Sequence, residues 1–237
     1  MERRNLELLP RREETREKIK FNANVKVVKF QLDEIESHFK ENLQYIKDQF
    51  NIADELMQSK RKEDAGNIWS SQIVFLESAF DFYLHELTKY GLSEMFVGNW
   101  DKTEKYCNLS VRMGVVDKAL NAREDTDWFL DFVNGFFREI TLVSYKSFKD
   151  QMNLLGIDVQ EIADAVFYEV KSSIKTKDKL GNCLDGLYNK RNIIAHQSGR
   201  RHSDAKREVI TKDIVEIYIK AIEKIVEKIH ELAKQKG

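Results

Sequence analysis

An arginine and a histidine that lie close together in the sequence are the residues of this chain best suited to chemistry. Arg191 and His196 stand five positions apart in the segment RNIIAHQSGRRH. Arginine keeps its positive charge and can bind an anion such as a phosphate through several N–H groups. Histidine exchanges protons near neutral pH, as general acid–base catalysis requires. The pair therefore points to a site that binds an anionic group and moves a proton beside it.

The position of Arg191 on its predicted helix supports this interpretation. The helix spans residues 179–197, and its apolar face is formed by Leu180, Leu184, Leu187 and Ile194. At about 100° per residue, Arg191 lies within about 60° of all four. An unpaired guanidinium buried there would cost several kcal/mol. Arg191 must therefore face an acidic residue, an anionic ligand or a wet cleft, and an ordinary ion pair with a neighbouring helix is the structural alternative.

Positive charge is concentrated around this helix end. Between Lys190 and Lys212 the chain has seven Lys or Arg against two acidic residues, a local charge of +5 in a chain of net charge −1. Such a cluster can meet a phosphate backbone, although a solvated loop is the simpler alternative. The candidate contacts are Lys190, Arg200, Arg201, His202, Lys206 and Arg207.

Length and composition exclude several classes of protein. With 237 residues, 42% of them hydrophobic, the chain can bury a real core and is not expected to be disordered. The longest uncharged run, residues 65–76, is shorter than the roughly 20 residues that span a bilayer. The charged N-terminus does not resemble a signal peptide, and two cysteines give no disulfide framework. We therefore expect a cytoplasmic protein with no membrane association.

The elements that carry these residues are predicted to be helices. Pro10 is the only proline and the chain has ten glycines, so the residues that interrupt helices are scarce. An apolar residue recurs every three or four positions from Val28 to Met57, which predicts a first helix of about 35 residues that is closed by Gly66. A second helix is expected from Asn67 to Gly91. Further helices are predicted at residues 109–120, after a Thr126 cap, and at 145–155, 159–170, 179–197 and 214–232.

The fold class that follows is all-α. Residues 1–66 are expected to form an N-terminal segment whose long amphipathic helix packs on the rest of the bundle. Residues 67–237 are expected to form the main helical domain, and the two segments together one compact unit. No repeat and no linker rich in Pro, Gly or Ser separates them.

The segment from Arg191 to His196 resembles the Rx4–6H signature of the HEPN superfamily, in its common RNxxAH form. Two upstream segments, SSQIVFLESAFDFYLHEL and SYKSFKDQMNLLGIDVQEIADAV, resemble the RiboL-PSP group of that superfamily. The resemblance covers residues 67–235 and leaves the long first helix as an extension. It implies an all-α, HEPN-like helical bundle.

The resemblance also implies an activity. Many HEPN proteins are metal-independent ribonucleases of toxin–antitoxin, abortive-infection and CRISPR-associated systems. Arg191 and His196 would then be catalytic, and attack of the 2′-OH on the adjacent phosphate would leave 2′,3′-cyclic phosphate and 5′-OH ends. Asn192 would hold the motif or contact phosphate, and Glu77 would orient Arg191. Neither a metal nor a cofactor is expected.

The spacing of the motif leaves two arrangements of the site open. Positions i and i+5 lie about 140° apart on a regular helix, so Arg191 and His196 are not expected to share a face. Either the helix unwinds after Ala195, or two motifs meet across a two-fold homodimer, as the resemblance implies. RNA and an antitoxin or another defence protein are the further partners expected.

Two other functions remain open from the sequence. The chain could be a non-catalytic HEPN scaffold or RNA-binding subunit of a defence or toxin–antitoxin complex. It could also be a helical interaction module in which Arg191 pairs with an acid of the same subunit and serves only stability.

Two more side-chain rows have functional and structural interpretations. Glu77, Asp81 and His85 recur every four residues, which would suit a metal site or a solvated helix face. Trp128, Phe132 and Phe136 have the same spacing and would suit base stacking or, more simply, a core.

Overall fold

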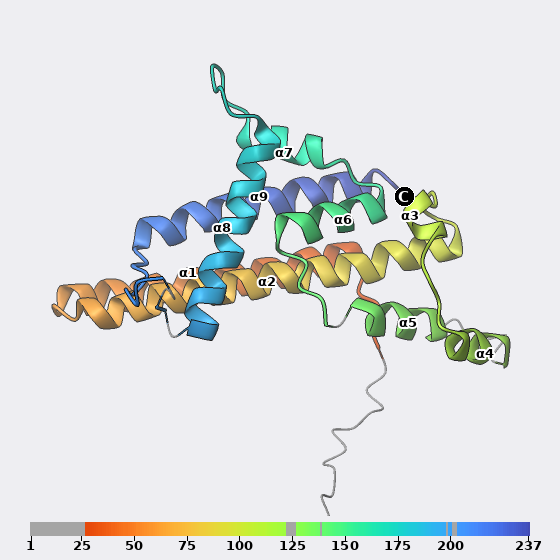
Figure 1. Ribbon diagram of the computed structural model, residues 1–237, viewed down its shortest axis with the longest axis horizontal. Coiled ribbons are helices and arrows are strands. Elements are labelled where there is room, and N and C mark those ends of the chain that lie inside the picture. Colours follow the sequence, from red (N-terminus) through yellow and green to blue (C-terminus); the bar gives the residue numbers. More distant parts are fainter. Residues whose placement is uncertain (1–26, 122–126, 138, 198, 201–202) are drawn as a thin grey trace, which may run out of the picture.

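The computed structural model describes residues 27–121, 127–137, 139–197, 199–200 and 203–237. Within these ranges the chain forms α-helices and no strand, which confirms the predicted all-α fold (Figure 1). The helices are α1 (Leu32–Gln58), α2 (Lys62–Val97), α3 (Glu104–Cys107), α4 (Met113–Asn121), α5 (Asp127–Phe137), α6 (Tyr145–Leu155), α7 (Val159–Phe167), α8 (Thr176–Gln197) and α9 (Lys212–Lys234). None of them is long and apolar enough to span a bilayer.

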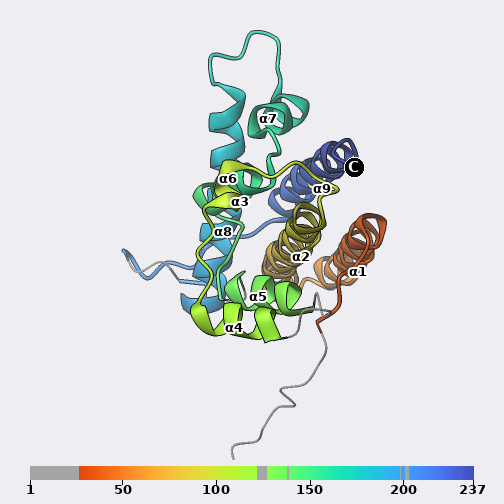
Figure 2. The ribbon, with the colours of Figure 1, turned by 90° about the vertical axis from the view of Figure 1, so that its right-hand side faces the viewer.

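The long helix α2 is the centre of the bundle. It contacts α1, α5, α6, α8 and α9. Viewed end-on, α1, α2 and α9 lie side by side along the long axis of the molecule, and α8 crosses them (Figure 2). The arrangement places the C-terminal half of α8 against the N-terminal half of α2.

Helix α1 packs on α2 through the apolar stripe that the sequence predicts. Ile35, Phe39, Leu43 and Ile46 are all buried, one turn apart. The Gln72 side chain of α2 donates a buried hydrogen bond of 2.7 Å to the Ile46 carbonyl and ties the two helices together. The helix has 27 residues rather than about 35, because it begins only after Gln31, whose backbone N–H donates to the Glu34 carboxylate at 2.7 Å, and already ends at Gln58.

Helix α2 is longer than predicted, since both glycines expected to bound it lie inside it. A Cβ at Gly91 would meet the Trp100 ring at 2.6 Å and the Leu155 side chain at 2.8 Å, so glycine is required there for close packing. A Cβ at Gly66 would have no neighbour within 4 Å. The helix ends at Gly98, whose φ of +90° is the left-handed conformation typical of a C-cap. The expected boundary after residue 66 therefore falls within a helix.

These two glycines give a matched prediction for stability. Gly91→Ala should lower the free energy of unfolding by about 1–3 kcal/mol, because the new methyl group overlaps the buried Trp100 ring. Gly66→Ala should raise it by about 0.5–1 kcal/mol, since alanine favours a helix and meets no obstacle. Urea unfolding followed by circular dichroism measures both. Equal effects at the two positions would contradict this account of Gly91.

The shorter helices follow the sequence to different degrees. Helix α6 has the predicted bounds and ends at Gly156, whose φ is +67°. Helix α7 ends at Phe167, three residues earlier than expected.

In α5 the buried face is formed by Phe129, Val133 and Phe137, and Phe129 stacks on Phe96 of α2 with ring centroids 4.3 Å apart. Of the predicted aromatic row, Trp128 and Phe132 are partly buried against the core and Phe136 is exposed. Thr126, its expected cap, lies outside the described residues.

Candidate functional site

Helix α8 carries Arg191 to a position above α2. Leu180, Leu184 and Leu187 are fully buried and fix the helix in the core. Arg191 continues this buried face, and 28% of its side chain is exposed. The predicted placement of an arginine within the apolar face of α8 is therefore found in the structure, at the point where the face reaches the surface.

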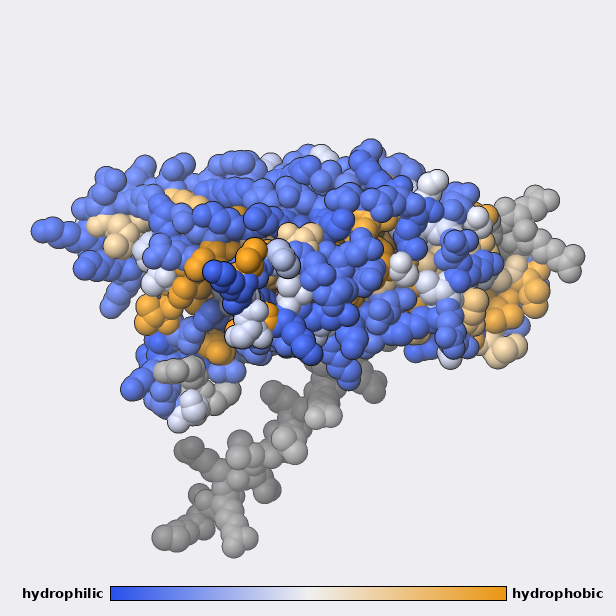
Figure 3. All heavy atoms as spheres, turned by 90° about the horizontal axis from the view of Figure 1, so that it is seen from above, coloured by the Kyte–Doolittle hydropathy of each residue, from blue (hydrophilic) through white to orange (hydrophobic). Residues whose placement is uncertain are grey.

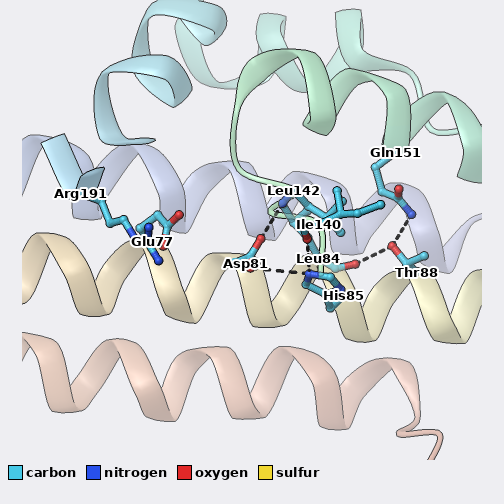
Figure 4. A network of polar contacts seen from close by, with 9 residues as sticks. All are labelled: Glu77, Asp81, Leu84, His85, Thr88, Ile140, Leu142, Gln151 and Arg191. Carbon is cyan, nitrogen blue, oxygen red and sulfur yellow. Dashed lines mark hydrogen bonds and ion pairs between the residues drawn. The ribbon is translucent and has the colours of Figure 1, made fainter. Parts of the chain in front are cut away.

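The partner of Arg191 is Glu77, a carboxylate in the buried face of α2. Only 2% of Glu77 is exposed, and its neighbours in the helix, Leu76 and Phe80, are fully buried. Arg191 Nε lies 3.4 Å from Glu77 Oε2, and Figure 4 shows the two side chains meeting between α8 and α2. Glu77 had been expected beside the arginine from the resemblance alone.

Burial gives this carboxyl an unusual titration. Removal from water raises the pKa of Glu77 from 4.5 to about 7, although Arg191 acts to lower it, and the neighbouring Asp81 raises it further. Burial therefore favours the protonated form of Glu77, and the Arg191 guanidinium favours the ionised form.

The outer end of the Arg191 guanidinium contacts His196. The Arg191 Nη1 atom lies 3.0 Å from His196 Nε2 and donates a second hydrogen bond of 3.0 Å to Asn192 Oδ1. A guanidinium can only donate, so Nε2 of the histidine accepts. The contacts form a chain from buried Glu77 through Arg191 to the exposed imidazole of His196.

The expectation that Arg191 and His196 cannot meet within one helix is wrong. Helix α8 does not unwind after Ala195 but continues to Gln197. The long arginine side chain reaches across its own helix, and the helix end departs from regular geometry, because the Gly199 N–H donates to the Ile193 carbonyl six residues back. No second chain is needed to bring the two side chains together.

The predicted RNA-binding residues are placed differently from one another. Lys190 is ion-paired with Glu208 at 2.7 Å, and Lys212 with Asp54 at 2.7 Å. Arg200 donates to the Ala205 carbonyl at 2.9 Å and forms a β-bridge with Arg207. Arg200, Lys206 and Arg207 are exposed and form no ion pair within the described ranges. Arg201 and His202 lie outside the described residues.

The row formed by Asp81 and His85 has a role that neither sequence interpretation included. Asp81 accepts the Leu142 N–H at 2.7 Å, and His85 Nε2 lies 2.9 Å from the Ile140 carbonyl oxygen (Figure 4). These side chains hold the connection between α5 and α6 against α2. Within the described residues, no group of three His, Cys, Asp or Glu is arranged to bind a metal ion.

Comparison of the chain with models of protein families, with curated proteins and with solved structures gives no match. The function is therefore inferred from the residues and their geometry.

Proposed function

We propose that this protein is a metal-independent endoribonuclease of the HEPN type, acting in a bacterial toxin–antitoxin or antiviral defence system. The observation that carries the proposal is the contact of Arg191 with His196 at 3.0 Å, which lies at the surface. The buried Glu77 lies behind Arg191. An anion-binding group and a proton-exchanging group are thus adjacent and accessible.

In the proposed reaction the Arg191 N–H turns from His196 Nε2 to the phosphate, and the freed Nε2 accepts the proton of a ribose 2′-OH as that oxygen attacks the adjacent phosphorus. The new O2′–P bond forms as the P–O5′ bond breaks, leaving a 2′,3′-cyclic phosphate and, after protonation of the leaving oxygen, a 5′-OH. Arg191 neutralises the charge that builds on the phosphoryl oxygens, the largest electrostatic demand of such a step. Glu77 holds the inner side of the guanidinium and leaves its outer N–H groups for the phosphate.

A homodimer would complete this chemistry. One histidine that has accepted the 2′-OH proton cannot at the same moment supply the proton for the 5′ oxygen. A second copy of His196, brought by a two-fold axis that places the ends of both α8 helices together, would serve as the acid. Asn192 would then keep each arginine oriented across the interface.

A non-catalytic scaffold or RNA-binding subunit is the second candidate function. The ion pair of Arg191 with an acidic residue of its own chain is what the helical interaction module predicts, and it is compatible with the scaffold as well. The Glu77 contact fits both functions. A structural pair, however, does not require the second contact of the guanidinium with an exposed imidazole.

RNA cleavage without metal ions tests the proposed function. The purified protein is incubated with total bacterial RNA in excess EDTA, and the ends of the fragments are analysed. We expect fragments with 2′,3′-cyclic phosphate and 5′-OH ends. Intact RNA in the presence of folded dimer would favour the scaffold, and cleavage that EDTA abolishes would contradict the proposed chemistry.

A further inference from the structure

A cleft of about 440 Å³ lies beside the end of α8 and was not predicted from the sequence. Its walls come from three parts of the chain: the turn from α1 into α2, the end of α8, and the segment that leads into α9. The lining residues that matter for its chemistry are Gly66, Asn67, Trp69, Ser70, Ile194 and Arg207. From above, the surface is mostly hydrophilic, and hydrophobic residues appear in several separate places along the long axis (Figure 3).

The lining combines apolar walls with polar groups at several points. Trp69, Ile194 and Ile210 form the apolar part of the lining, and Trp69 and Ile210 are themselves largely buried. Asn67 and Ser70 from α2 add groups that can hydrogen-bond. A planar, partly apolar ligand with polar edges fits this combination, as a nucleobase does.

Two positively charged side chains also line this cleft. Lys62 and Arg207 line it, and neither forms an ion pair within the part of the chain that the structure describes. Glu208 also lines it but is already paired with Lys190. Glu63 also lines the cleft, so a phosphate next to the planar group would have to lie at Lys62 or Arg207 and away from the acidic side chains.

Gly66 indicates that the cleft is kept open. A glycine inside a helix costs about 0.5–1 kcal/mol relative to alanine. At Gly91 the packing of Trp100 explains the glycine, whereas at Gly66 no other segment of the described chain lies within 4 Å of the position of a Cβ. The space that a side chain of residue 66 would occupy is available to a ligand.

The cleft and the candidate site share the C-terminal part of α8. Ile194 lines the cleft and stands between Arg191 and His196 in the sequence, on the same side of the helix as Arg191. A strand of RNA whose phosphate contacts Arg191 would have an adjacent nucleotide within reach of the cleft.

We propose that this cleft binds one base of a single-stranded RNA, next to the phosphate that Arg191 contacts. The proposal rests on the proposed function in taking RNA as the ligand, but it requires binding only and not cleavage. The apolar walls accept the face of the base, Asn67 and Ser70 its edge, and Lys62 and Arg207 the flanking phosphates.

Filling the cleft from Gly66 tests this proposal. Gly66→Phe is made in the His196→Ala protein, and binding is measured by fluorescence anisotropy with a short labelled RNA and with an abasic sugar–phosphate strand of the same length. We expect the Kd for RNA to rise by about 10- to 100-fold, the size of one base contact, and the Kd for the abasic strand to stay unchanged. Gly114→Phe, at a helical glycine of α4 that also has open space, is the matched control and should bind like the parent.

Three results would overturn the proposal: no binding of RNA by the parent, unchanged RNA binding by a folded Gly66→Phe variant, or equal weakening of both strands, which would assign the cleft to phosphate. Cleavage by the unmodified protein is measured separately. If the unmodified protein cleaves RNA but Gly66→Phe does not weaken RNA binding, the base site alone is refuted. If Gly66→Phe weakens the binding of RNA but not of the abasic strand, and the unmodified protein does not cleave RNA, the catalytic function alone is refuted.

Discussion

His196→Ala is expected to lower the rate of RNA cleavage by about 10²–10⁴-fold, the usual contribution of a general acid or base. The loss should lie in kcat, because the exposed imidazole is proposed to move a proton and not to hold the RNA. Single-turnover cleavage of a labelled RNA measures the effect. Added imidazole should restore part of the rate in the alanine variant, which a merely structural histidine would not allow.

Arg191 provides the comparison for this experiment. Arg191→Lys keeps a positive charge but loses the planar set of N–H groups that contacts Glu77, Asn192 and His196. If cleavage persisted in both His196→Ala and Arg191→Lys, the observed nuclease would be a contaminant or would use another site. Melting temperatures of the variants show whether each is folded.

The unmodified protein is expected to lose about 3 kcal/mol of its free energy of unfolding as the pH rises, and Glu77→Gln should abolish this loss. The carboxyl titrates near its ordinary pKa of 4.5 in the unfolded chain but with a pKa of about 7 in the folded chain. Between these values the folded chain holds a proton that the unfolded chain has released, so the free energy of unfolding falls as the pH rises. A pKa raised from 4.5 to about 7 corresponds to that loss of about 3 kcal/mol, which glutamine cannot show.

The measurement is urea unfolding of both proteins between pH 4.5 and pH 8. As the pH rises, the free energy of unfolding of the unmodified protein should fall relative to that of Glu77→Gln. Glu55→Gln, on the exposed face of α1, is the control that removes a carboxylate without touching the site. Parallel profiles for all three proteins would show that the pKa of Glu77 is the same in the folded and in the unfolded chain.

The sequence was sufficient for the fold class and for most helices, because apolar periodicity and scarce proline act locally. The bounds of α6 were predicted correctly since Gly156 adopts the left-handed conformation that ends a helix. Gly91 was misread because its role depends on Trp100 and Leu155, which reach it only through the tertiary packing. The same limit applies to Asp81 and His85, whose partners are backbone groups of a distant connection.

The candidate site, like the fold, was predicted from the sequence only in part. The placement of Arg191 within an apolar face follows from helix periodicity, and its side chain meets Glu77 as the resemblance implied. Its contact with His196 was missed, because an angle between Cα positions ignores the length of an arginine side chain and the irregular end of α8. The cleft could not be foreseen, since its walls come from segments far apart in the chain.

The distance in sequence between Glu77 and Arg191 has a consequence for synthesis of the protein. The two residues lie over a hundred positions apart and meet only when α8 docks on α2. A chain still being translated therefore has no completed site until its last quarter has left the ribosome and folded back. For an enzyme that would cleave RNA, this order delays activity until the nascent chain is almost free of the RNA-rich machine that makes it.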